Sequence, residues 1–161
     1  PEVLRRWPAG GLGNTAWALA VLGCRDRAVF RALAERAVHP AVLQAFSAWD
    51  MSNLMWAFAT AGVQDMELME AVSRTALERQ LQHNHVGLAL MAWSWATLQV
   101  TDTALMRFLL VQAKGDIRSF GLRSITNMAW AFGTLGVEDE GLLRLLAQQL
   151  MRCGARNPAG P

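Results

Sequence analysis

The sequence contains no tyrosine, a single lysine and only two cysteines among its 161 residues. The absence of tyrosine, and the rarity of β-branched residues that alternate with polar ones, argue against a β-sheet fold. Because Cys24 and Cys153 lie near opposite ends of the chain, they do not indicate a disulfide framework, and a reducing compartment is expected.

The chain also has little net charge and no long apolar run. Its formal charge of +2 is small for a protein that holds nucleic acid by charge alone, although its cations are 14 arginines and Lys114. No stretch reaches about 18 uncharged apolar residues, so no membrane span is expected.

Motifs of catalysis are missing as well. There is no phosphate-binding glycine loop, HExxH pattern or nucleophile elbow, and no cluster of cysteine and histidine. His83 and His85 could face one metal ion, but no carboxylate or cysteine lies near them in the sequence, and core packing is the expected role of His83. We therefore expect no enzyme activity, no cofactor and no metal.

A repeat marked by tryptophan is the main positive feature of the sequence. Trp17, Trp56, Trp93 and Trp130 follow one another at intervals of 39, 37 and 37 residues. A large ring precedes each by ten residues and an aspartate follows by nine; most also have an asparagine three before and a glycine six after. These companions are Trp7, Phe46, His83 and Phe120; Asp26, Asp65, Asp102 and Asp139; Asn14, Asn53 and Asn127; and Gly23, Gly62 and Gly136. Such a period is typical of stacked supersecondary units.

Each repeat is predicted to be a pair of helices. Residues 48–61 have apolar side chains on two faces at helical spacing, as expected of a helix sandwiched between neighbours. Gly62 is suited to end that helix in the left-handed conformation. Asp65 is then placed to cap the next helix by accepting a hydrogen bond from a free backbone N–H. The equivalent glycines, aspartates and tryptophans of the other repeats receive the same structural roles.

The sequence therefore predicts an all-α protein, a right-handed α-solenoid of about four helix–turn–helix repeats with a period of 37–39 residues. The array is expected over residues 1–153, and residues 154–161 are expected to form a disordered tail or truncated linker. Because the chain begins at Pro1 without an initiator methionine, we expect it to be a segment of a longer protein.

Several units resemble the octotricopeptide repeat, a repeat of paired helices. The clearest are FSAWDMSNLMWAFATAG from Phe46 and FGLRSITNMAWAFGTLG from Phe120, and GLGNTAWALAVLG from Gly11 fits as well. The third unit, GLALMAWSWATLQ from Gly87, lacks the asparagine and the glycine and has Trp95 where phenylalanine is usual. The resemblance covers residues 7–153.

The octotricopeptide family is similar to pentatricopeptide proteins. Related arrays occur in FAST-kinase-like proteins, some of which end in a RAP domain, and in proteins of the RNA-editing substrate-binding complex. The resemblance implies a single-stranded RNA-binding module of a mitochondrial or chloroplast factor for RNA processing, mRNA stability or translation. Its implied partners are single-stranded RNA and protein subunits of a ribonucleoprotein complex, with no membrane. We see no RAP domain in the sequence.

The four repeated tryptophans have two alternative roles. Large rings at one helical position usually pack between units, and on this interpretation Trp56→Ala would cost about 3–5 kcal/mol of stability. Stacking of RNA bases would instead need exposed ring faces. Trp7 and Trp49, which lie where first helices begin, are the better candidates for stacking. We expect the four repeated rings to be core.

Polar side chains on the first helix of each repeat are the candidates for RNA contact. Asparagine is unfavourable inside a helix, so its recurrence indicates either a hydrogen-bond ladder between units or contacts to bases. Polar positions that vary from unit to unit could read bases, or they could simply be solvated. The candidate RNA-binding residues are Arg6, Asn14, Asp50, Ser52, Asn53, Arg123, Ser124, Thr126 and Asn127.

Two other functions stay open. One is a protein–protein interaction scaffold, which the acidic residues Asp65, Glu67, Glu70 and Glu78 could favour. The other is an enzyme whose catalytic domain lies elsewhere in a longer chain. Surface charge separates RNA binding from scaffolding, because a basic stripe would indicate RNA, whereas an apolar or acidic groove would indicate a protein partner.

Overall fold

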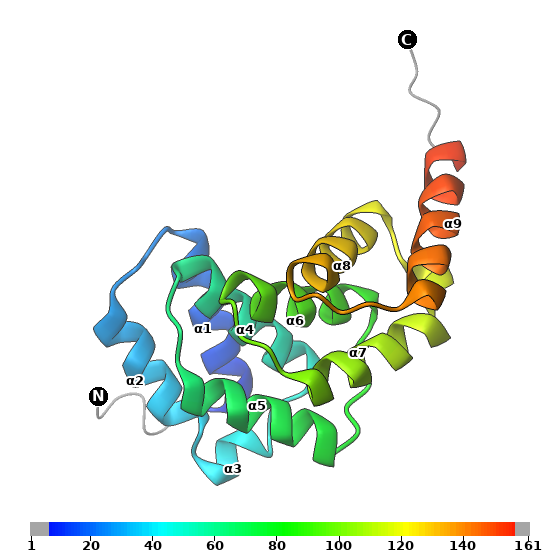
Figure 1. The fold of residues 1–161 in the computed structure, drawn as a ribbon. Helices are drawn as coiled ribbons and strands as arrows, with labels where there is room; N and C mark the ends of the chain where they lie inside the picture. The colour runs from blue at the N-terminus through cyan, green and yellow to red at the C-terminus, as the bar shows by residue number, and fades with distance from the viewer. Residues whose placement is uncertain (1–6, 157–161) are drawn as a thin grey trace. The chain divides into compact units, whose positions relative to one another are not determined.

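The computed structural model describes residues 7–156, and no strand occurs among them. The first helices, which carry the repeated tryptophans, are α1 (Ala9–Val21), α4 (Ala48–Ala61), α6 (His85–Thr97) and α8 (Leu122–Thr134). The second helices are α2 (Arg27–Ala37), α5 (Met66–Glu78), α7 (Thr103–Gly115) and α9 (Glu140–Arg156). A short α3 (Pro40–Leu43) and a 3-10 helix, η2 (Ile117–Ser119), precede α4 and α8. The prediction of an all-α helical-repeat fold is confirmed (Figure 1).

The chain divides into two compact units, with the boundary between Gln82 and His83. In the N-terminal unit, α1 packs on α4 and α2 on α5. In the C-terminal unit, α6 packs on α8 and α7 on α9. Like helices of consecutive repeats thus lie side by side within each unit, as in an α-solenoid. The single array over residues 1–153 and its right-handed sense stay predictions.

The turns between paired helices contain the predicted capping aspartates and left-handed glycines. Each of the four aspartates accepts a hydrogen bond at the start of a second helix, which satisfies a backbone N–H that the helix leaves free. These bonds join Asp26 to Ala28, Asp65 to Leu68, Asp102 to Leu105 and Asp139 to Leu142. Gly23, Gly62 and Gly136 have positive φ. In the third repeat Gln99 takes the same left-handed conformation, with φ 56°.

Small residues let the first helices approach closely. In the N-terminal unit, a Cβ added to Gly13 would lie 3.2 Å from the backbone oxygen of Asp50, so α1 and α4 meet almost backbone to backbone. In the C-terminal unit, Ala89, Ala92 and Ala96 form a buried face of α6. Small side chains on one helix face permit close packing of this kind.

In three repeats a large core side chain lies two residues after the repeated tryptophan. Phe58, Trp95 and Phe132 are buried at this position. In the N-terminal unit, the rings of Phe58 and Phe30 make an edge-to-face contact with centroids 5.0 Å apart. Burial of one such ring stabilises the fold by several kcal/mol, roughly 3–5.

A polar side chain from each second helix holds the backbone of the ring residue that opens the repeat. The pairs are Arg36 with Trp7 O (3.3 Å), Arg79 with Phe46 O (2.8 Å), Gln112 with His83 N (2.9 Å) and Gln149 with Phe120 O (3.0 Å). Three of the four rings are buried, and the backbone of all four residues is hydrogen-bonded. Packing and a hydrogen bond therefore both hold the start of these repeats. The sequence analysis did not find this recurring bond.

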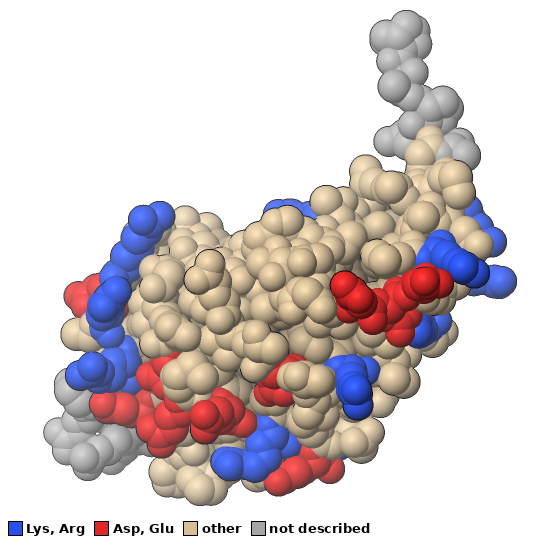
Figure 2. All heavy atoms as spheres, in the orientation of Figure 1, with Lys and Arg blue, Asp and Glu red and all other residues tan. Residues whose placement is uncertain are grey.

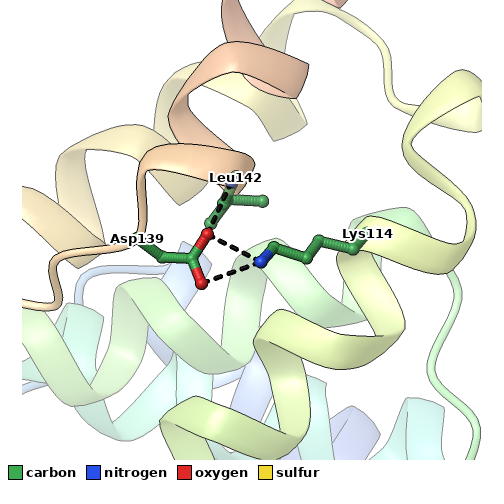
Figure 3. Close-up of polar contacts among 3 residues, drawn as sticks. All are labelled: Lys114, Asp139 and Leu142. Atoms are coloured by element: carbon green, nitrogen blue, oxygen red, sulfur yellow. Dashed lines mark hydrogen bonds and ion pairs between the residues drawn. The ribbon is translucent and has the colours of Figure 1, made fainter.

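One ion pair ties α7 to the start of α9 (Figure 3). Lys114 Nζ lies 2.7 Å from Asp139 Oδ1 and 2.8 Å from Oδ2, while the backbone N–H of Leu142 donates to Oδ1. The hydrogen bond from Lys114 lowers the pKa of Asp139, and the bond from Leu142 acts in the same direction. A lowered carboxyl pKa stabilises the fold at neutral pH, and this contribution is lost as the pH falls through the folded-state pKa.

Residues 154–156, which were expected to belong to a tail, are helical. Helix α9 continues through Gly154 to Arg156, whereas the tail was expected from Gly154. Glycine weakens a helix by about 1 kcal/mol relative to alanine but does not end one by itself. In the preceding turn, the buried Gln149 donates hydrogen bonds to the carbonyls of Arg118 and Phe120, which anchors the helix. The remaining residues, 157–161, lie outside the described part of the chain.

His83 is a buried ring whose protonation opposes folding. Burial lowers its pKa from 6.5 to about 4, so the folded state keeps it neutral. Between those two pH values the unfolded chain binds the proton and the folded chain does not, and stability therefore falls as the pH falls. From pH 7 to about 4.5, we expect this one residue to remove about 2–3 kcal/mol of the free energy of unfolding, measured by chemical denaturation.

The matched control is His83→Phe, because phenylalanine occupies the equivalent positions 46 and 120. This variant should keep the ring packing and lose the titration, so its stability should fall less in acid. An equal loss of stability in both proteins between pH 7 and 4.5 would contradict the assignment.

Candidate nucleic-acid interface

The expectation that all four repeated tryptophans would be core residues is wrong for Trp17 and Trp130, which are exposed. Trp17 is 47% exposed and Trp130 is 48% exposed, while Trp56 and Trp93 are half-buried. The core ring is instead two positions later, where Trp95 is only 1% exposed. Because both positions are apolar, the pattern shows two apolar helix faces and does not tell which one a neighbour covers.

The exposed tryptophans belong to a continuous helix face that recurs in all four repeats. We call it the open face: the positions seven before, three before, at, and four after the repeated tryptophan, which align along one side of a helix. Its members are Gly10, Asn14, Trp17 and Val21 on α1; Trp49, Asn53, Trp56 and Thr60 on α4; Val86, Leu90, Trp93 and Thr97 on α6; and Arg123, Asn127, Trp130 and Thr134 on α8. All are exposed or half-buried except Asn53.

Five of the seven tryptophans occupy open-face positions, three in the N-terminal unit and two in the C-terminal unit. Trp49, which the sequence analysis favoured for base stacking, is among them and is 46% exposed. Trp7, the other favoured ring, is half-buried and lies ahead of α1. Exposed aromatic rings at equivalent positions of a helix face in each unit are unusual for a surface without a partner and mark a site of interaction.

The open face carries almost no charge. The described first helices contain only two charged residues, Asp50 and Arg123, and of these only Arg123 is on the open face. Charged side chains gather instead over the second helices, including the acidic ones of α5 (Figure 2). The face is thus neither the basic stripe expected for electrostatic RNA binding nor an acidic groove.

The repeated asparagines have no structural partner. Asn14 is exposed, Asn127 is half-buried and Asn53 is 8% exposed. None of their side chains hydrogen bonds to a described residue, so the expected ladder between units is not formed. Each amide stands one turn before a tryptophan on the open face, where it can donate to and accept from a ligand.

Other sequence-predicted site residues are committed to the fold. Asp50 forms a capping box with Ser47, accepting from its backbone N–H at 3.0 Å and from its hydroxyl at 2.6 Å. Ser52 is fully buried and donates to the carbonyl of Ala48 at 2.9 Å. Ser124 is also buried, with its hydroxyl 3.3 Å from His85 Nδ1. The burial of Ser52 and Ser124 argues against base contact by these two side chains, whereas base contact by the half-buried Asp50 stays a prediction.

The remaining two described candidates are exposed on α8, whereas Arg6 lies outside the described residues. Thr126 donates to the carbonyl of Leu122 within its own helix and stands beside the open face, not on it. Arg123 stands two turns before Trp130 on the open face. Arg123, Asn127 and Trp130 therefore align a guanidinium, an amide and an indole along one helix.

Two threonines on the open face were not anticipated. The hydroxyl oxygens of Thr60 and Thr97 are buried and have no hydrogen-bond partner among the described residues. Each threonine stands one turn after a tryptophan. A buried hydroxyl without a partner costs about 1–3 kcal/mol.

Two pockets carry arginine pairs away from the open face. In the N-terminal unit the pocket is lined by Arg27 and Arg31 of α2 with Gly62, Val63, Gln64 and Asp65. In the C-terminal unit it is lined by Arg118, Gln149, Arg152 and Cys153. Arginine binds phosphate through two parallel hydrogen bonds, so these pockets are candidate contacts for a nucleic-acid backbone and carry no base readout.

Neither a metal site nor a membrane span is found in the part of the chain that the structure describes. The residues there form no group of three or more histidine, cysteine, aspartate and glutamate side chains that could hold an ion. His83 and His85 both pack in the C-terminal unit, where the ring of His85 lies 5.8 Å from that of Phe120. No described helix has the length and apolar character needed to cross a membrane.

Comparison with known proteins gives one family. The chain matches the family model described as RNA-editing substrate-binding complex 6 protein over residues 9–155. The match runs from the start of α1 almost to the end of α9, so it covers all four first helices and hence the whole open face. A search of curated proteins found no match.

Proposed function

Because the chain belongs to the RNA-editing substrate-binding complex 6 protein family, we propose that it is a single-stranded RNA-binding module of an RNA-editing complex. The open face is the proposed binding surface. The single observation that carries this proposal is the exposure of the repeated tryptophans, Trp17 and Trp130 above all, on an otherwise uncharged helix face. The proposed setting is a mitochondrion or chloroplast, as the octotricopeptide and FAST-kinase-like resemblance implies, and the module itself carries no catalysis.

We propose that base stacking contributes more to binding than electrostatic attraction does. Single-stranded bases stack on exposed aromatic rings with about 1–3 kcal/mol per base, and this works for any base because each has a π face. The asparagine and threonine side chains that flank the rings supply donors and acceptors for base edges. Double-stranded RNA hides its bases in the helix, so it should not bind the open face.

The test is fluorescence anisotropy with labelled single-stranded and double-stranded RNA of mixed sequence. We expect binding of the single strand only. With one or two phosphate contacts, affinity should fall about three- to sevenfold between roughly 50 and 200 mM salt, since each contact adds about 0.7 to the slope for a single strand. Absence of binding at low salt to several unrelated oligonucleotides would contradict the proposal.

A second candidate, a protein–protein scaffold within the complex, is favoured by the near absence of charge on the open face. An apolar face is the expected mark of a protein partner. The same experiment separates the two: a scaffold would bind neither form of RNA, whereas the same face would bind a protein subunit of the complex.

A further inference from the structure

We propose that Trp93 and Trp130, in the C-terminal unit, form a clamp that takes one unpaired nucleobase between their two indole rings. The inference rests on the proposed RNA-binding function and names the ligand of one part of the open face. It assigns a single base to a defined pair of side chains, on the adjacent helices α6 and α8.

The spacing of the two rings fits an inserted base. Their centroids are 6.5 Å apart and their planes are inclined by 38°. Two stacked rings lie about 3.5 Å apart, so a base with a ring on each face needs a gap of about 7 Å. The rings contact each other in the unbound chain, so the proposed clamp requires them to give up this contact and to turn through the 38° between their planes.

Polar groups without partners stand on both sides of the pair. The hydroxyl of Thr97 is buried and unpartnered one turn after Trp93. The amide of Asn127, one turn before Trp130, bonds to no described residue. The Asn127 amide donates and accepts, so it can bond to the edge of any base, and base identity is left to stacking area. The larger purines should then bind more tightly than pyrimidines.

The N-terminal unit offers a matched comparison without a clamp. Trp17 has the same register position and nearly the same exposure as Trp130, 47% against 48%. The only tryptophan–tryptophan ring contact among the described residues is that of Trp93 with Trp130. Trp17 can therefore stack on one face of a base, whereas the pair in the C-terminal unit can hold both faces.

The experiment measures affinity for a labelled oligoadenylate of about ten nucleotides by anisotropy, with the full chain. A clamp needs both rings, so Trp93→Leu and Trp130→Leu should each weaken binding about tenfold, and the double variant should weaken it by about the same tenfold. Adding Trp17→Leu should multiply the loss, because that ring acts alone. Oligouridylate should bind the native chain more weakly than oligoadenylate does. This difference in affinity should be smaller for the double variant.

Other results overturn the clamp. If the double variant loses the product of the two single losses, about a hundredfold, then the rings bind separate bases and the RNA proposal survives without the clamp. If the native chain binds neither oligonucleotide, both proposals fail. Trp93→Phe and Trp130→Phe, which keep a ring and the packing, should retain most of the affinity. Equal losses for phenylalanine and leucine would show that the rings do not stack on the base.

Discussion

Trp95→Ala is expected to lower the free energy of unfolding by about 3–5 kcal/mol, the range for removal of a large buried ring. The side chain is 1% exposed and fills the core of the C-terminal unit, where a cavity would remain. Since a domain of this size is stable by only about 5–15 kcal/mol, this loss should be plain in chemical or thermal denaturation.

The matched control is Trp93→Ala, two residues earlier on the same helix. Trp93 is on the open face, and its loss removes a ring contact with Trp130 worth about 1 kcal/mol. Helix propensity changes equally in both variants, so the difference between them isolates burial. If Trp93→Ala destabilises the protein as much as Trp95→Ala, the repeated tryptophans are core and the open face does not exist.

Simultaneous replacement of Trp17, Trp56, Trp93 and Trp130 by leucine should reduce affinity for single-stranded RNA at least about a hundredfold. Each stacked base contributes about 1–3 kcal/mol, and leucine offers no π face. Leucine favours helix and keeps the surface apolar, so the fold should persist. Anisotropy measures the affinity, and circular dichroism with a melting curve verifies the fold.

A second set of four substitutions provides the control for general surface hydrophobicity. Val29, Val111, Leu143 and Met151 are exposed apolar residues of the second helices, and alanine at all four should leave RNA affinity within about twofold. Equal losses from the two sets would mean that RNA adheres to any apolar surface of the chain. An unchanged affinity in the leucine variant would mean that the binding surface lies elsewhere.

The paired helices could be predicted from the sequence because local physics determines them. Helix α4 begins and ends at Ala48 and Ala61, as the apolar spacing indicated. Asp65 accepts its bond from Leu68, and Gly62 has φ 69°, as a helix start and a helix end require. Capping and the left-handed conformation depend only on neighbouring residues, so one sequence suffices to recognise them.

The direction of burial could not be predicted in the same way. Trp93 and Trp95 lie on two apolar faces of one helix, and the sequence does not say which face a neighbouring helix covers. The prediction relied on the size of the tryptophan side chain, because large rings are usually buried. The small residues were the better signal: Gly13 on α1 marks the side on which the next first helix approaches.

The sequence does not show which polar side chains are buried and which lack a hydrogen-bond partner. Ser52 and Ser124 were expected to contact RNA but are buried, and Thr97 was overlooked although its hydroxyl lacks a partner. Whether a hydroxyl bonds to its own helix, to another helix or to nothing depends on tertiary packing. Thr97 lies on the open face, whereas Ser52 and Ser124 lie on buried faces of their helices.

The most direct test of the open face is the response of the indole N–H signals in a nitrogen–proton correlation spectrum as single-stranded RNA is added. The chain has seven tryptophans, so exposed and buried rings report together in one sample. Stacked bases should shift the signals of Trp17, Trp56, Trp93 and Trp130 and leave that of Trp95 in place. Shifts confined to other tryptophans, or none among these four in a sample that binds RNA, would contradict the account.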